Sequence, residues 1–155
     1  MSSPFNQYFD VQQAGRFLVG TKTVEKEVGT ASKFLVETIY KLQQAGKVPI
    51  LVSPPPRSGF NIGSCLERQD RHLFYLREGC DFSKSEYLKH ESSVIAALSK
   101  VKDETGVRLV WLGDLLCDGD LCRTRIDGTY VYRDSGHLSI DGSKALLGNW
   151  VVAKD

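Results

Sequence analysis

The sequence lacks the features that would assign it at once to a membrane, secreted or nucleic-acid-binding class. No apolar run in its 155 residues approaches the roughly 18 residues that a membrane-spanning helix needs. The opening segment MSSPFNQYFD has no basic stretch followed by an apolar one, so nothing in it indicates a signal peptide. The formal net charge is only +1, which argues against a dedicated nucleic-acid binder, because such proteins neutralise phosphates with clustered Lys and Arg. From these absences we expect either a cytosolic chain or a part of a longer protein.

What is present is ordinary for a soluble globular fold. The sequence is 41% hydrophobic and 25% charged, and no repeat or low-complexity tract interrupts it. A chain of this length suits one domain, which we expect over residues 1–155, and it can bury about 70% of the surface of its unfolded form.

Cysteine is scarce, and its positions are informative. The four cysteines are Cys65, Cys80, Cys117 and Cys122, the last two within LLCDGDLC. Pairing of sequence neighbours is the simplest of three connectivities, and in the chain-entropy model the two loops would stabilise the fold by about 3 and about 2 kcal/mol. Disulfides would imply an oxidising compartment. Free buried thiols and a zinc site stay open as alternatives, although the Cys-x-x-Cys spacing that is typical of structural zinc is absent.

The first half of the chain predicts one helix and one buried strand. Thr30 to Ala45 is expected to be a helix that ends at Gly46, with Leu35, Ile39 and Leu42 at helical spacing. The apolar run from Val48 to Ser53 ends at Pro54-Pro55-Pro56 and predicts a strand buried on both faces. Residues 57–82 are rich in Gly, Arg and polar groups and are expected to form a long excursion.

The second half continues this alternation. A helix is predicted from Ser83, with Glu86 completing a capping box, to about Asp103. A strand is predicted over residues 107–112, a further one over 129–132, and a last helix from about Ser139. The expected inward positions of the two helices are Val94, Ile95, Leu98, Val101, Leu146 and Trp150. This order predicts an α/β domain with a parallel sheet, although residues 16–20 are the only weak candidate for an opening strand.

Two residues with catalytic chemistry lie close together near the C-terminus. His137 follows Asp134 by three residues, after a predicted strand and before a predicted helix. In a nucleophile–His–Asp system one ring nitrogen of the histidine faces the nucleophile, and a carboxylate holds the other. The spacing alone is a weak signal, because loops favour Asp in any case and both side chains could simply be solvated. The following Leu138-Ser139, which leads into a capped helix, makes the pattern more specific.

At this point the sequence resembles a known family. YRDSGHLSIDGSKAL is similar to the C-terminal block of SGNH (GDSL-type) hydrolases, above all to the periplasmic SGNH domain fused behind acyltransferase-3 membrane proteins, which O-acetylate bacterial surface polysaccharides. GKVPILVSPPPRSGFNIGSCLER resembles the family's central strand and proline-rich loop, and LLCDGDLC resembles its cysteine pair. The resemblance covers most of the chain from Gly46 onward.

The resemblance implies a fold, a reaction and a location. The fold would be a three-layer α/β/α, flavodoxin-like domain with a parallel sheet. The activity would be O-acyl transfer, in which Asp134 orients His137 and His137 acts as the general base. The implied partners are an acyl (acetyl) donor, a polysaccharide acceptor and an upstream acyltransferase-3 membrane domain, at the periplasmic face of the inner membrane. The resemblance implies neither a cofactor nor a metal. A carbohydrate acetylesterase and a non-catalytic carbohydrate-binding module are the alternatives.

The departures from the family pattern concern the nucleophile. The family's nucleophilic serine belongs to a Gly-Asp-Ser tripeptide after an N-terminal strand, and this chain has no such tripeptide. Gly113-Asp114-Leu115 is the nearest match, but leucine has no nucleophilic atom, and we expect residues 110–115 to be an ordinary strand. Nor can the Gly and Asn of the family's oxyanion hole be placed. We therefore expect the chain to be the C-terminal portion of an SGNH domain, inactive unless other residues complete it.

Several other residues could contribute chemistry, but a structural role is the simpler expectation for each. We expect Ser53 to end a strand, Ser135 to lie in a turn and Ser139 to cap a helix, none as a nucleophile. Arg57 could meet an acyl donor or a sugar, but we expect a surface arginine, and we expect His72 and His90 to be solvated. Phe74 and Tyr75 could form a sugar-stacking surface, although packing under the long loop explains them at least as well.

Overall fold

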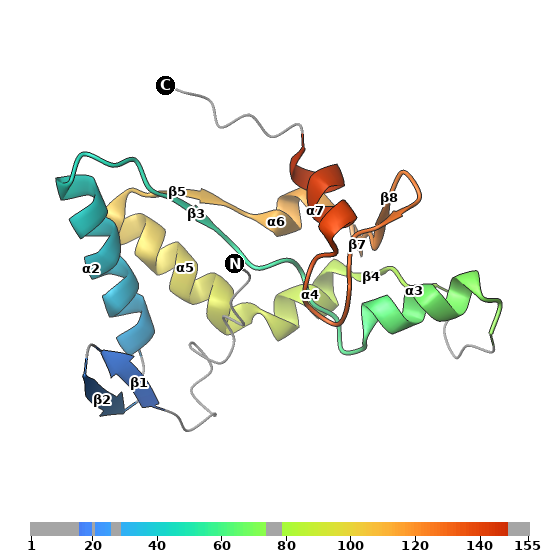
Figure 1. Ribbon diagram of the computed structural model, residues 1–155, viewed down its shortest axis with the longest axis horizontal. Helices are drawn as coiled ribbons and strands as arrows, with labels where there is room; N and C mark the ends of the chain where they lie inside the picture. The colour runs from blue at the N-terminus through green and yellow to red at the C-terminus, as the bar shows by residue number, and fades with distance from the viewer. Residues whose placement is uncertain (1–15, 20, 26–28, 74–78, 149–155) are drawn as a thin grey trace. The chain divides into compact units, whose positions relative to one another are not determined.

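The chain folds as two units, which a computed structural model describes over residues 16–19, 21–25, 29–73 and 79–148 (Figure 1). The first unit comprises residues 1–54 and 91–110, and the second comprises residues 55–90 and 111–155. None of the helices in the described residues has the length and apolar character to cross a membrane.

The first unit combines two helices with two short sheets. Strands β3 and β5 pair in parallel, with Ile50 opposite Arg108, and the hairpin β1–β2 is antiparallel. Its elements are β1 (Arg16–Val19), β2 (Lys22–Glu25), α2 (Thr30–Gln44), β3 (Ile50–Val52), α5 (Ser92–Thr105) and β5 (Arg108–Val110). Figure 1 shows α2 beside α5, and β3 beside β5. The mixed α/β character and the parallel pairing are as predicted, and residues 16–19 form an antiparallel hairpin strand.

The core of the first unit lies between α2 and α5. Val36 and Ile39 of α2 pack with Val101 and Val107, and Leu35 and Leu51 lie against this cluster. Leu42, which shares the helical spacing of Leu35 and Ile39, is 42% exposed and lies outside this core. The last turn of α2 instead meets the end of α5 through polar bonds, from Tyr40 Oη to the Glu104 carbonyl and from Gln43 Nε2 to the Thr105 carbonyl.

Strand β3 is less covered than predicted. All three of its residues are half-buried, whereas the sequence predicted burial on both faces. Within the described residues the parallel sheet has only two strands, so β3 has a neighbouring strand on one side alone.

The single helix predicted from Ser83 to Asp103 is in fact two helices. Helix α4 (Lys84–His90) ends before Glu91, whose φ of −108° and ψ of 10° interrupt the helical backbone, and α5 begins at Ser92. Only half of the predicted capping box forms: Ser83 Oγ accepts the Glu86 amide at 3.1 Å, but the Glu86 carboxylate accepts the Gly59 amide instead. Of the expected inward positions of this segment, Val94, Leu98 and Val101 are at most 1% exposed. Ile95 is only half-buried.

The second unit is built from short elements. Strands β4, β7 and β6 form an antiparallel sheet, and β8 and β9 form a hairpin. Besides α4, its elements are α3 (Ile62–Asp70), β4 (Phe82–Ser83), α6 (Leu112–Leu116), β6 (Cys117–Asp118), β7 (Leu121–Cys122), β8 (Arg125–Ile126), β9 (Thr129–Tyr130) and α7 (Ile140–Leu147).

Three expectations for this unit need correction. The excursion at residues 57–82 contains helix α3, whose N-cap Asn61 accepts the Ser64 amide at 3.0 Å and whose apolar face is buried. The strand expected over residues 110–115 ends at Val110, and Gly113-Asp114-Leu115 lies in helix α6. The strand expected over residues 129–132 is β9, which pairs antiparallel with β8 rather than joining the parallel sheet.

Both predicted disulfides are present. Cys65 of α3 bonds to Cys80, and Cys117 of β6 bonds to Cys122, its partner across the β6–β7 ladder. Because all four cysteines are paired in this way, neither the free-thiol nor the zinc alternative applies. Phe82 fills the core beside them and meets the rings of Phe60 and Tyr132 edge-on.

Helix α7 starts where it was predicted. Ser139 is its N-cap and accepts the Gly142 amide at 2.8 Å. Leu146 is half-buried, and the prediction for Trp150 lies outside the described residues.

Loss of a disulfide should cost more stability where the loop that it closes is longer. Replacing both Cys65 and Cys80 by Ser should lower the free energy of unfolding by about 3 kcal/mol, and the Cys117→Ser, Cys122→Ser pair by about 2 kcal/mol, because the longer loop restricts the unfolded chain more. Urea denaturation under oxidising conditions measures both values. A larger loss for the second pair would contradict the loop-length account.

Candidate catalytic site

A closed loop between strand β9 and helix α7 holds the Asp134–His137 pair. Tyr132 and Leu138 form an antiparallel bridge at its base. Within it the Arg133 amide donates to the His137 carbonyl at 2.9 Å, and just outside it the Ser139 amide donates to the Val131 carbonyl at 2.8 Å. Backbone hydrogen bonds on both sides of the Tyr132–Leu138 bridge thus close the loop.

Inside this loop the Asp134 carboxylate binds four groups from three nearby residues. Its Oδ1 accepts the backbone N–H of Gly136 at 3.0 Å and that of His137 at 2.8 Å. The ring Nδ1 of His137 lies 2.9 Å from both Oδ1 and Oδ2. The guanidinium of Arg133 donates to Oδ2, at 3.2 Å from Nη2. One carboxylate therefore orders both the loop backbone and the imidazole.

This contact defines the tautomer of the neutral imidazole. An ionised carboxylate can only accept hydrogen bonds, so Nδ1 carries the proton and the lone pair is on Nε2. The side chain of His137 is 42% exposed and that of Asp134 is 31% exposed. The pair is thus oriented and reachable from outside, which is what a general base requires.

The hydrogen bonds keep Asp134 ionised. Partial burial of its carboxyl raises the pKa, but the backbone N–H groups of Gly136 and His137, the His137 ring and the Arg133 guanidinium outweigh that effect and hold the pKa well below its usual range. A carboxylate that stays charged can stabilise the imidazolium that forms when His137 takes a proton.

Residues Tyr132 and Arg133, at the start of the loop, contact residues from other parts of the second unit. Tyr132 is 1% exposed, and its hydroxyl donates to the Pro56 carbonyl at 2.9 Å. Burial raises the pKa of this phenol, so it stays protonated and keeps donating. Gly63, in the first turn of α3, lies so close to the Arg133 carbonyl that a Cβ there would be 2.0 Å from the oxygen.

Helix α3 is also tied to the β8–β9 hairpin. The Asp70 carboxylate accepts the hydroxyl of Tyr130 and the guanidinium of Arg125, and that guanidinium carbon lies 4.4 Å from the centre of the Tyr130 ring. The hydrogen bond from Tyr130 is the main cause that lowers the pKa of Asp70. This cluster braces the strand that precedes the loop.

The other sequence candidates lie in structural roles. Ser139 is the α7 cap, and its hydroxyl donates to the Tyr130 carbonyl. Ser135 lies in the bend of the loop, and Ser53 is 3% exposed with its hydroxyl on the Pro54 carbonyl. His72 and His90 are exposed, as expected. The candidates Phe74 and Tyr75 lie outside the described residues.

Arg57 is the site residue that sequence reasoning underrated. It was expected at the surface, but it is half-buried and its guanidinium lies against Gly136 of the loop. The sequence shows Arg57 directly after three prolines, but nothing in it connects residue 57 with residue 136.

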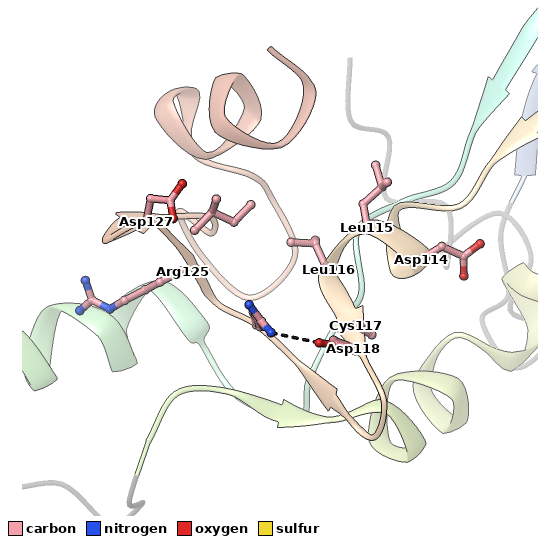
Figure 2. Close-up of a pocket in the computed structure, with 9 residues that line it drawn as sticks. Asp114, Leu115, Leu116, Cys117, Asp118, Arg125 and Asp127 are labelled. Atoms are coloured by element: carbon pink, nitrogen blue, oxygen red, sulfur yellow. Dashed lines mark hydrogen bonds and ion pairs between the residues drawn. The ribbon is translucent and has the colours of Figure 1, made fainter. Parts of the chain in front are cut away.

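A separate pocket of about 440 Å³ opens beside α6 and β6 (Figure 2). The dashed line in Figure 2 is the exposed ion pair between Arg123 and Asp118. The described residues that line the pocket are Asp114, Leu115, Leu116, Cys117, Asp118, Arg123, Arg125, Ile126 and Asp127. None of these is a Ser, Thr or His, so they offer no hydroxyl nucleophile and no imidazole base. In the described part of the chain, no three His, Cys, Asp or Glu side chains gather as they would around a metal ion.

The model of one protein family matches almost the whole chain. This is the SGNH domain that occurs fused to AT3 (acyltransferase-3) domains, and the match runs over residues 2–150. The chain belongs to the SGNH domain family. No protein of curated function matches it.

Among solved structures, this SGNH domain is similar to the periplasmic domain of a lipopolysaccharide acetyltransferase from Salmonella ser. Paratyphi A. The TM-score is 0.55 at 22% sequence identity, over 85% of this chain and 51% of that one. At this identity the likeness concerns the fold alone. The chain spans about half the length of the structure that it matches.

The low pKa of Asp134 predicts a pH-dependent contribution to stability. A carboxyl whose pKa is lower in the folded than in the unfolded state stabilises the fold above its unfolded pKa, near 3.8, and loses this contribution as the pH falls toward the folded value. Asp134→Asn should therefore lower the free energy of unfolding more at pH 7 than at pH 2.5. Chemical denaturation of both proteins at the two pH values measures this difference, and an equal loss at both would mean that the charge of Asp134 is not involved.

Proposed function

We propose that this SGNH domain is part of an O-acyltransferase that acetylates a bacterial cell-surface polysaccharide. Asp134 orients the ring of His137, and His137 is the general base. The observation that carries the proposal is the contact of Nδ1 of His137 with both oxygens of an ionised Asp134, 2.9 Å from each. Membership of a family that occurs fused to AT3 domains, and a fold like that of a lipopolysaccharide acetyltransferase domain, support acyl transfer as the reaction.

In the first half of the proposed reaction, a serine hydroxyl attacks the carbonyl carbon of the acyl donor. Nε2 of His137 takes the hydroxyl proton, and the imidazolium is stabilised by Asp134. The imidazolium then gives this proton to the leaving group of the donor, and an acyl-serine remains.

In the second half, Nε2 takes the proton of a sugar hydroxyl. The sugar oxygen attacks the acyl carbon, the bond to serine breaks, and His137 returns the proton to the serine oxygen. The product is an O-acetylated sugar, and the enzyme is restored without a cofactor or a metal. With water in place of the sugar, the same steps would release free acetate.

We propose that the serine and the oxyanion-hole donors come from outside this chain, which would be the C-terminal portion of a three-layer α/β/α SGNH domain. The absence of a Gly-Asp-Ser tripeptide supports this, and Gly113-Asp114-Leu115 lies within helix α6 rather than at a nucleophile position after a strand. The two disulfides support a periplasmic location, where such bonds persist. By family analogy the acyl donor would come through an AT3 membrane domain.

Removal of the base should abolish acyl transfer. His137→Ala in the full-length protein should lower acetyl transfer to polysaccharide to background, because the group that takes the hydroxyl proton in the proposed mechanism is then missing. Mass spectrometry of the polysaccharide measures the product, and thermal unfolding checks that the variant folds. His72→Ala, at an exposed histidine that follows helix α3, is the matched control and should transfer normally. Transfer by a folded His137→Ala protein would refute the assignment.

Loss of the Asp134 charge should be nearly as severe. Asp134→Asn should lower kcat by about 10⁴, as a comparable change does in serine proteases, because the amide NH2 can donate to Nδ1 and so favour the wrong tautomer, and the neutral amide does not stabilise the imidazolium. Steady-state kinetics with an acetyl donor measure kcat, and the ratio of transferred to free acetate separates a transferase from an esterase.

A fluorophosphonate probe should label the full-length protein and leave this chain alone unlabelled; labelling of this chain would place the nucleophile within it.

A further inference from the structure

The guanidinium of Arg57 lies on the loop between the two residues of the proposed pair. A Cβ placed on Gly136 would be 2.6 Å from Nε of Arg57 and 3.1 Å from its Cδ and Cζ. Since real Cβ atoms do not approach so closely, the arginine occupies the space that any side chain at position 136 would need. Gly136 directly follows Ser135 and directly precedes His137.

The backbone conformation does not require glycine at this position. Among the described residues, the glycines with a positive φ are others: Gly29, Gly46, Gly106, Gly119 and Gly128. An alanine could therefore adopt the backbone of Gly136, and the contact with Arg57 is the constraint that remains. Gly63 differs, because a Cβ there would meet backbone atoms, which cannot move aside as a flexible side chain can.

The backbone on either side of Arg57 is held in place. Pro56 is fully buried, and its carbonyl accepts the hydroxyl of Tyr132, two residues before Asp134. On the other side, Ser58 is 9% exposed and its hydroxyl donates to the Phe60 carbonyl. The backbone at Arg57 is thus held in place, and its neighbour Pro56 is hydrogen-bonded to Tyr132 at the start of the loop.

We propose that Arg57 is a positioning residue of the Asp134–His137 pair and acts by packing over Gly136. The amides of Gly136 and His137 are the two backbone donors to Asp134 Oδ1, so a side chain that holds Gly136 also holds these donors and the carboxylate between them. The functional part of this inference rests on the proposed role of His137 as a base. Its structural part, the order of the Asp134–His137 contact, does not.

The first test is spectroscopic and needs no activity. The Nδ1 proton of His137, hydrogen-bonded to a carboxylate, should give a sharp downfield proton NMR signal in this chain at neutral pH. Arg57→Ala should broaden or remove the signal, while Arg71→Ala, at an exposed ion pair of α3, should leave it unchanged. An unchanged signal in a folded Arg57→Ala protein overturns the proposal.

A second pair of variants separates packing from charge. Arg57→Met keeps most of the stem that covers Gly136 but loses the charge, so it should keep the signal and at least a third of the wild-type kcat. Arg57→Ala should lower kcat of the full-length protein about 10- to 100-fold at unchanged KM, since the base is misplaced but the substrate contacts are not. If Met fails like Ala while Arg57→Lys retains full activity, the charge acts and the packing account is wrong.

The contact can also be tested from its other side. Gly136→Ala should displace Arg57 and weaken the downfield signal, and adding Arg57→Ala should weaken it little further, because the contact between the two residues is already lost. Strictly additive losses would overturn the proposal. If all the NMR outcomes hold but His137→Ala still transfers acetyl groups, the positioning by Arg57 stands and the proposed function fails.

Discussion

The loop between β9 and α7 depends on the hydrogen bonds of one carboxylate. Oδ1 of Asp134 accepts two successive backbone N–H groups, and both of its oxygens face Nδ1 of His137. Because the charge is shared among these donors, the pKa of Asp134 is low, and the carboxylate remains an acceptor at any physiological pH. The same bonds thus shape the turn and set the tautomer of the imidazole, so the structure of the loop and its proposed chemistry have one cause.

Close packing around this loop leaves it little room to rearrange. The Arg133 carbonyl lies against Gly63 of α3, and Arg57 lies against Gly136. The Tyr132 hydroxyl binds the Pro56 carbonyl from within the core. At Gly63 and Gly136 the missing side chain lets these groups come close, so both glycines matter for their small size rather than for their flexibility. A base that must face a nucleophile gains from such a rigid support, because small misplacements are costly in rate.

The chain belongs to a family whose SGNH domain occurs fused to AT3 domains, and it spans about half the length of the acetyltransferase domain that it resembles in fold. Under the proposed function, the acid–base pair and the nucleophile would come from different parts of a longer protein. That division is physically reasonable, because the loop is ordered by its own bonds and by contacts within the second unit. The residues that line the pocket beside α6 do not include Asp134 or His137.

The sequence by itself determined the local features of this protein. Helix α2, the Ser139 cap and the Asp134-x-x-His137 loop follow from spacing, capping and turn chemistry, which act over a few residues. For the cysteines the sequence offered three connectivities, and the structure has the simplest of them. Tertiary structure decided the rest. Helix α3 is stabilised by burial of Ile62 and Leu66 and by a disulfide, which outweigh its polar composition, and the helix that was expected to be continuous breaks at Glu91. The contact of Arg57 with Gly136 joins residues 79 positions apart (136 − 57), and only the folded chain can bring them together.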